Sequence, residues 1–225
     1  MVDLVIGESL IGKLEVKNGA RTIAVTTTVG TRDHGTRTDG FLTVDGTNAT
    51  QTARFESGGE ESGGLFVATG AGTDALVTVS GGGVMTLARL SLADGAQSNA
   101  LMFVDGMEAT DGGERRSTVT APFPPPGPEK AGRAAAASPG NGDCIIGQTG
   151  RGTLNVSNGA LVRCRQIAVG QTAGSRGEVN IDGIFRSVNA RVVADGPRTE
   201  DGVICIGRVP LCGATSGVVR GEVVV

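Results

Sequence analysis

The sequence predicts an all-β chain folded as a single-stranded parallel β-helix, a right-handed β-solenoid with long loop insertions. Three observations predict this class: the composition, a motif that recurs, and a constant spacing between its copies. The chain has 225 residues, of which 38 are glycine, six are phenylalanine and none is Trp or Tyr. Hydrophobic residues still make up 39 %, which suits a folded chain of many short strands and tight turns.

The recurring motif is clearest at residues 6–20, "IGESLIGKLEVKNGA", and 146–160, "IGQTGRGTLNVSNGA", which are identical at eight of fifteen positions. The step from Gly7 to Gly30 is 23 residues, and so is the step from Gly147 to Gly170. Self-similarity at such a period indicates a solenoid, with each copy forming one coil of three short strands. The general chirality of parallel crossovers predicts a right-handed coil.

Each copy also alternates between apolar and polar residues. In "TLNVS", Leu154 and Val156 share one face, whereas the residues between them are polar. The segments "KLEVK", "FLTVD" and "EVNID" repeat this pattern. A single coil cannot bury its apolar face alone, so we expect stacked coils to align these residues into interior ladders.

Glycines are expected at the corners between strands, where a positive φ or a close backbone approach is needed. The predicted corner residues are Gly7, Gly19, Gly30, Gly46, Gly106, Gly147, Gly159, Gly170 and Gly183. The Asn-Gly and Asp-Gly pairs among them also fit an antiparallel sandwich or barrel built from hairpins. The solenoid is favoured because the stretch after each "NGA" varies, and the match returns only a full coil later.

The strings "GTLNVSNGA" and "IAVGQTAGSRGEVNIDG" resemble the Gly-rich β-helical repeats of bacterial autotransporter passengers and related surface proteins. The resemblance covers 141–183 and 6–20 and is diffuse elsewhere. It implies a parallel β-helix displayed outside a cell, and its motif contributes no catalytic residue. The four cysteines depart from this family, whose passengers usually lack them.

Segments 32–39, 56–64 and 107–143 interrupt the period. The third contains "APFPPPGPEKAGRAAAASPGNGD", a Pro-, Gly- and Ala-rich run that suits an insertion or linker. We therefore expect solenoid coils over 1–106 and 144–225, continuous with each other. The 52 residues from Met102 to Leu154, about twice the period, favour a loop that leaves one corner.

Several partner classes are not expected. The net charge is −3 and the basic residues are scattered, which argues against nucleic-acid binding. No apolar segment has the length of a membrane span, and the N-terminus lacks the pattern of a signal peptide. No cofactor is predicted. We expect an extracellular or cell-surface protein whose leader is absent from this chain, or a part of a longer chain.

Acidic residues give the first candidate sites. Asp45, Asp105 and Asp182 occur in "[VI]-D-G" triplets, and stacking could align them into a calcium-binding column. The favoured interpretation is that each Asp before Gly caps an Asx-type turn. Glu60–Glu61 and Glu200–Asp201 are acidic pairs of the kind used in glycoside hydrolysis, here interpreted as solvated charges.

His34, the single histidine, adjoins Asp33 and would be the base of any Ser-His-Asp or Cys-His unit. It is interpreted as a solvated loop residue. Two N-glycosylation sequons, at Asn48 and Asn155, matter only for a secreted eukaryotic protein.

The four cysteines form no CxxC pair, so a zinc or redox motif is not indicated. Cys144 and Cys164 lie nearly a coil apart and are expected to face each other on neighbouring rungs. Cys205 and Cys212 flank "IGRVPL" and would close a small loop. Two disulfides are predicted, the alternative being small buried thiols.

The function expected from these patterns is that of a non-catalytic structural or adhesive β-solenoid, a building block of a surface fibre or layer. The chain starts in a repeat and finishes "GVVRGEVVV", so we expect end-to-end self-association or an adjoining domain. The alternative is a carbohydrate-binding or carbohydrate-cleaving β-helix, tailspike-like or lyase-like, with a surface glycan as partner. An intracellular bactofilin-type scaffold fits the insertions and the predicted disulfides less well.

Overall fold

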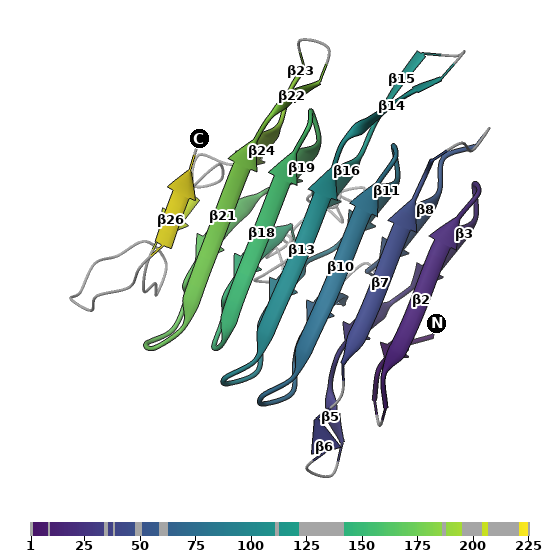
Figure 1. The fold of residues 1–225 in the computed structure, drawn as a ribbon. Helices are drawn as coiled ribbons and strands as arrows, with labels where there is room; N and C mark the ends of the chain where they lie inside the picture. The colour runs from purple at the N-terminus through teal and green to yellow at the C-terminus, as the bar shows by residue number, and fades with distance from the viewer. Residues whose placement is uncertain are drawn as a thin grey trace, which may run out of the picture.

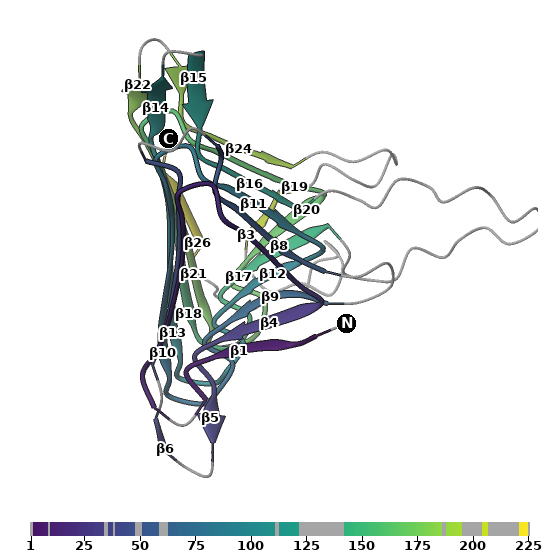
Figure 2. The same ribbon diagram turned by 90° about the vertical axis from the view of Figure 1, so that its right-hand side faces the viewer.

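The chain folds into three parallel sheets that wind around one core (Figures 1 and 2). The computed structural model describes residues 2–8, 10–33, 36–37, 39–47, 51–58, 63–110, 113–121, 142–185, 188–194, 204–206 and 221–224. Every described pairing within the three sheets is parallel, and each strand pairs with the corresponding strand one turn away. This arrangement is a three-sided β-solenoid and excludes the antiparallel sandwich.

Sheets A, B and C are defined by their strands. Sheet A contains β1 (Leu4–Ile6), β4 (Thr26–Val29), β9 (Gly64–Val67), β12 (Leu90–Leu92), β17 (Asp143–Ile146), β20 (Gln166–Val169) and β25 (Ile204–Ile206). Sheet B contains β2 (Gly12–Lys17), β7 (Gly40–Asp45), β10 (Asp74–Ser80), β13 (Asn99–Asp105), β18 (Arg151–Ser157), β21 (Arg176–Asp182) and β26 (Gly221–Val224). Sheet C contains β3 (Arg21–Ala24), β8 (Arg54–Ser57), β11 (Val84–Leu87), β16 (Thr118–Ala121), β19 (Leu161–Cys164) and β24 (Arg191–Ala194).

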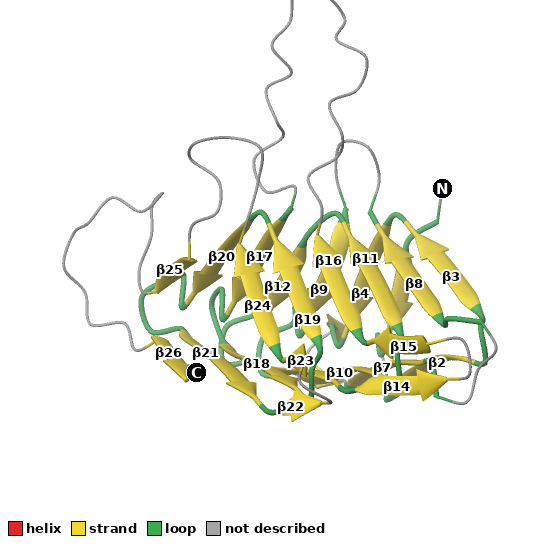
Figure 3. Ribbon diagram, turned by 90° about the horizontal axis from the view of Figure 1, so that it is seen from above, coloured by secondary structure: helices red, strands yellow, loops and turns green. Residues whose placement is uncertain are grey.

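Each turn runs from sheet A through sheet B to sheet C. The first turn is β1, β2 and β3, the second β4, β7 and β8, and the third β9, β10 and β11. The fourth is β12, β13 and β16, the fifth β17, β18 and β19, and the sixth β20, β21 and β24. A seventh turn starts with β25 and β26. Figure 3 shows successive strands of each sheet side by side along the stack.

The core is a set of ladders inside the three sheets. In sheet B the inward positions hold Leu42, Val77, Met102 and Leu154, one above another, all buried. The predicted inward faces of the alternating segments are therefore confirmed. Most interior side chains are aliphatic, and Phe55 is the one buried phenylalanine among the residues whose side chains are described. Small aliphatic ladders fill a narrow solenoid, which explains how the chain does without Trp and Tyr.

Short hairpins extend two of the corners. β5 (Arg32–Asp33) and β6 (Thr36–Arg37) lie at the corner between sheets A and B. β14 (Met107–Thr110) pairs with β15 (Gly113–Arg116), and β22 (Ile184–Phe185) pairs with β23 (Val188–Asn189), both at the corner between sheets B and C. Figure 2 shows these last two hairpins next to each other beyond the end of sheet B.

The expected loop 107–143 has different bounds in the structure. Its first part forms the hairpin β14–β15, and 118–121 form β16 inside sheet C. The strand "TVTA" has four residues, no corner glycine and a proline run after it, so the repeat pattern did not reveal it. Met102 lies beside Leu154 in adjacent turns, so the 52 residues between them span one enlarged turn rather than two.

Candidate functional site

The predicted corner glycines mostly adopt the conformation that corners require. Eight of the nine have φ between +69° and +85°; Gly46 is the exception. At Gly147 a Cβ would lie 2.3 Å from the carbonyl oxygen of Arg176 in the next turn. The Asn-Gly pair at 158–159 has both residues at positive φ, with a hydrogen bond from Ala160 N to Ser157 O of 3.0 Å. It forms a β-turn that joins sheet B to sheet C instead of a hairpin.

The three aspartates of the "[VI]-D-G" triplets do align in one column, but serines separate them. The register places Asp105 beside Ser157 and Ser157 beside Asp182. Ser157 donates a hydrogen bond to Asp105 Oδ1 at 2.6 Å. Within the described residues no group of three or more His, Cys, Asp or Glu is placed to hold a metal ion.

Asp45 shows what the aspartates do at the corner. Its Oδ1 accepts hydrogen bonds from the Thr47 amide (3.0 Å) and hydroxyl (2.6 Å), which is an Asx turn, and from Ser80 (3.3 Å). Partial burial opposes ionisation of Asp45, but these hydrogen bonds and the Lys17 charge hold its pKa below the usual range. The interpretation of these aspartates as Asx-turn residues is therefore confirmed for Asp45.

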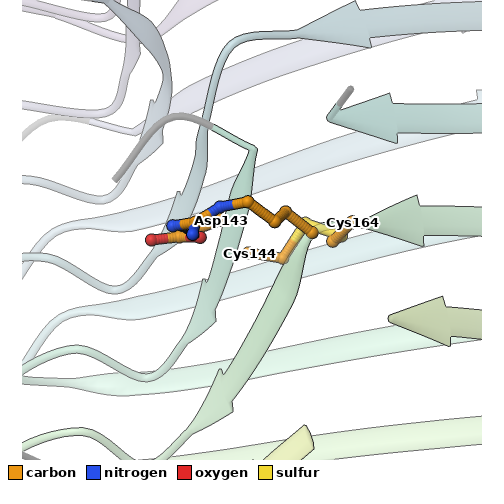
Figure 4. The surroundings of a disulfide bond; sticks show 4 residues. Asp143, Cys144 and Cys164 are labelled. Carbon is orange, nitrogen blue, oxygen red and sulfur yellow. Dashed lines mark hydrogen bonds and ion pairs between the residues drawn. A yellow bond between two sulfur atoms is a disulfide. The ribbon is translucent and has the colours of Figure 1, made fainter. Parts of the chain in front are cut away.

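Cys144 and Cys164 form a disulfide, with their Cα atoms 6.0 Å apart (Figure 4). They lie near the start of β17 and at the end of β19, and both side chains are buried. The predicted pairing is confirmed, but it joins the two ends of one turn and not neighbouring rungs. Beside the bridge, Arg165 Nη2 lies 2.6 Å from Asp143 Oδ1, with both side chains mostly buried. A covalent bond and an adjacent ion pair thus close the fifth turn where the chain returns from the 122–141 segment.

The second turn closes in the same place with a hydrogen bond. Thr27 occupies the ladder position of Cys144, and Ser57 that of Cys164. Ser57 Oγ donates to Thr27 Oγ1 at 2.9 Å, and both residues are buried. At this corner, paired side chains therefore join the first strand of a turn to its last.

Other sequence candidates lie outside the described residues: His34, Asn48, Glu60, Glu61, Glu200, Asp201 and Cys212. Cys205 belongs to β25, but its side chain is outside the description, as is that of Asp33. Asn155 lies on the outer face of sheet B as expected. Its Oδ1 accepts a 2.9 Å hydrogen bond from Asn180 Nδ2 of the next turn.

Arg116 links the hairpin corners of the fourth and sixth turns. Its Nη2 donates to Ala160 O (2.9 Å) and to Asn189 O (2.8 Å). Burial, reinforced by the nearby charge of Arg191, lowers the pKa of Arg116. The Arg116 side chain therefore connects β15 to β23 across the intervening fifth turn. No sequence motif predicted this contact.

The outer face of sheet B carries an apolar patch that the sequence reasoning missed. Phe41, Leu76 and Leu101 are consecutive in one outward ladder, and Phe103 is 37 % exposed in the next ladder. We call these four residues the sheet B patch. A signal was present: "FLTVD", "LVTVS" and "LMFVD" have apolar residues at outward positions, whereas "KLEVK", "TLNVS" and "EVNID" have polar ones.

The first turn exposes a second group of large apolar side chains. Five of the six exposed large hydrophobic residues among the described residues belong to it or to its corners: Val2, Val5, Leu10, Ile11 and Ile23. Because β1, β2 and β3 are each the first strand of their sheet, this group lies at one end of the stack. We call it the first-turn edge.

Comparisons with protein-family models, with curated proteins and with solved structures found no match. Among the described residues no helix is long and apolar enough to cross a membrane.

Proposed function

We propose that this chain is a non-catalytic structural unit, a right-handed β-helix that stacks end to end on the outside of a cell. The observation that carries the proposal is the first-turn edge. Val5 is 45 % exposed, Ile11 73 % and Ile23 62 %, beside strands that no other described strand covers. Exposed apolar side chains next to free strand edges favour addition of further parallel strands.

The backbone of the first turn offers hydrogen-bonding groups on a defined side. Gly30 N donates to Ile6 O at 2.8 Å, so the carbonyl of Ile6 faces β4. The amide and carbonyl of one strand residue point to the same side, and those of its neighbour to the other. The Val5 amide therefore faces the free edge. The bond from Gly58 N to Ala24 O places the Ile23 amide on the free edge of sheet C in the same way.

A second copy of this chain is the occupant we propose for this edge. At the other end of the stack, β24, β25 and β26 are parallel edge strands of the same three sheets. The outward ladder that starts at Lys13 reaches Glu178 in the sixth turn, and the backbone of Glu178 is in register with that of Glu222 in β26. Head-to-tail stacking would place Lys13 of one copy next in this ladder, which joins opposite charges.

The proposed location outside a cell rests on the disulfide and on the repeat resemblance. Structural disulfides form and persist in oxidising compartments. The bridge between Cys144 and Cys164 is buried within the solenoid, as expected for a structural cross-link. The bridge departs from autotransporter passengers, which usually lack cysteine, so the disulfide and the repeat resemblance support the location as separate arguments.

The experiment compares the wild-type chain with Val5→Pro and Val5→Thr. Proline removes the outward amide of Val5 and no hydrogen bond to β4, whereas threonine retains the amide as a control. We expect the wild type and Val5→Thr to form an open-ended series of species with rising concentration, by light scattering and negative-stain microscopy. Val5→Pro should stop the series. A wild-type chain that never forms a linear series contradicts the proposal.

A further inference from the structure

The outer face of sheet B is a second surface, independent of the ends of the stack. Figure 1 looks onto this face, and no described strand crosses it. Of its four outward ladders, three start at Lys13, Glu15 and Lys17 in the first turn, and the fourth holds Asp74, Asn99, Arg151 and Arg176. In the sixth turn the first three ladders hold Glu178, Asn180 and Asp182, and β26 adds a seventh strand beyond them. The sheet B patch lies between these rims, in the second to fourth turns.

We propose that two copies of the chain pair face to face through this surface, about a two-fold axis that runs parallel to the strands between β10 and β13. Such an axis places each ladder opposite the same ladder of the second copy. The order of the turns is reversed between the two copies. The third turn then faces the fourth turn of the second copy, the second faces the fifth, and the first faces the sixth. Aligned packing of this kind is the usual way in which two sheets stack, about 10 Å apart.

The sequence of the ladders is self-complementary under this operation. Leu76 faces Leu101 of the second copy, and the two-fold axis makes the contact twice. At the rims, Lys13 faces Glu178 of the second copy. Lys17 likewise faces Asp182.

The remaining facing pairs in the three ladders contain no like charges. They are Phe41 with Thr153, Glu15 with Asn180, Thr43 with Asn155, Thr78 with Phe103, Asp45 with Ser157, and Ser80 with Asp105. Apolar contacts at the centre with charged pairs at the rim are the usual anatomy of a protein interface. Opposite charges at both rims also fix the register and direction of pairing.

The area is adequate for a reversible dimer. The six strands of sheet B that overlap in this arrangement, about 4.8 Å apart and each about 20 Å long, give a face of roughly 600 Å². Pairing would bury about 1,200 Å² in total, at the lower limit of specific interfaces. Of the rim charges, the Lys13 side chain is 60 % exposed and lies 3.2 Å from Glu15, whereas the Glu178 side chain is 22 % exposed and lies 3.4 Å from Arg176.

Charge reversal tests the predicted register. Lys13→Glu should face Glu178 of the second copy with a like charge, and Glu178→Lys should face Lys13 likewise. Each single variant should raise the dimer Kd about tenfold, and the double variant Lys13→Glu/Glu178→Lys should restore it. Sedimentation equilibrium in the Val5→Pro background separates this closed dimer from end-to-end stacking. Single variants that weaken pairing without rescue in the double variant contradict the register.

Leu101→Glu tests the centre of the interface, with Leu161→Glu as its matched control on the outer face of sheet C. Both leucines are half-buried and outward-facing in central strands. Leu101→Glu should yield monomers and Leu161→Glu dimers, with circular dichroism unchanged in both. A strictly monomeric parent chain at millimolar concentration, or equal effects of the two variants, overturns the proposal.

Discussion

At the corner between sheets A and B, the residue that follows the sheet A strand adopts a left-handed backbone conformation in each of the first six turns. Glycine takes this position in turns one, two, five and six, whereas Ala68 and Ala93 take it in turns three and four, with φ of +56° and +58°. A non-glycine residue in this region costs about 1 kcal/mol. The stack therefore imposes the conformation even where the sequence does not favour it.

Gly147→Ala should lower the free energy of unfolding by about 2–4 kcal/mol, because the new Cβ overlaps the Arg176 carbonyl in addition to the φ penalty. Gly174 is the control, since its φ is +82° but no atom lies within 4 Å of the position that a Cβ would occupy. Gly174→Ala should lower the same quantity by only about 1 kcal/mol in urea unfolding. Equal losses would show that the contact with the next turn is unimportant.

Thr47→Val should raise the pKa of Asp45, because the carboxylate loses one of its hydrogen-bond donors. The folded-state pKa of Asp45 is depressed, so its stabilising contribution is present above the unfolded-state pKa of about 3.9. That contribution is lost as the pH falls through the lower folded-state value. Carboxyl NMR titration of both proteins measures the change; an unchanged Asp45 pKa would contradict the role assigned to Thr47.

At the scale of elements, closure of a turn depends on what joins its first strand to its last. The second turn uses the Thr27–Ser57 hydrogen bond, and the fifth uses the disulfide and the Asp143–Arg165 pair. The covalent closure occurs in the turn that follows the longest interruption of the chain. There β17 must be held in sheet A although 20 residues outside the description separate it from β16.

Cys144→Ala/Cys164→Ala should lower the free energy of unfolding by about 3 kcal/mol, as expected for a bridge between residues 20 apart. Reducing the wild-type protein should produce a shift of similar size, whereas the reductant should leave the double variant unaffected. Denaturant unfolding with and without reductant measures both. Alkylation of Cys144 and Cys164 in the unreduced, unfolded wild type would contradict the bridge.

For the whole molecule, stability should vary along the stack, because inner turns pair on both sides and the first turn pairs on one. Within the first turn, protection of the amides should also alternate from residue to residue, because successive amides point to opposite sides of the strand. Gly12 N donates to Asp39 O at 3.0 Å, so the Val16 amide faces β7 and the Glu15 amide faces the free edge.

Hydrogen exchange at low protein concentration should therefore be fast at Glu15, slower at Val16 and slowest at Val79 in β10. At concentrations that favour stacking, the Glu15 amide should become protected. Mass spectrometry or NMR resolves these residues. Protection of Glu15 equal to that of Val79 in dilute solution would mean that the edge is already covered.

The sequence alone predicted the all-β solenoid and the inward ladders, because these depend on period and alternation. It paired Cys144 with Cys164 correctly but placed them on neighbouring rungs, whereas the bridge closes a single turn. It did not reveal β16 or the corner hairpins, whose short segments carry no repeat glycine. Nor did it reveal the sheet B patch, because the alternation that marks Leu42 and Val77 as core residues does not say which outward residues, such as Phe41 and Leu76, become neighbours.

What the sequence determined by itself is the coil: which residues face inward and where the chain turns. Those properties are local, set by alternation and by glycine. Only the tertiary structure decided which turns are neighbours, because insertions of different lengths separate residues that stack directly, such as Met102 and Leu154. That register places serines between the aspartates, aligns the outward apolar residues into one patch, and puts the exposed apolar side chains at one end.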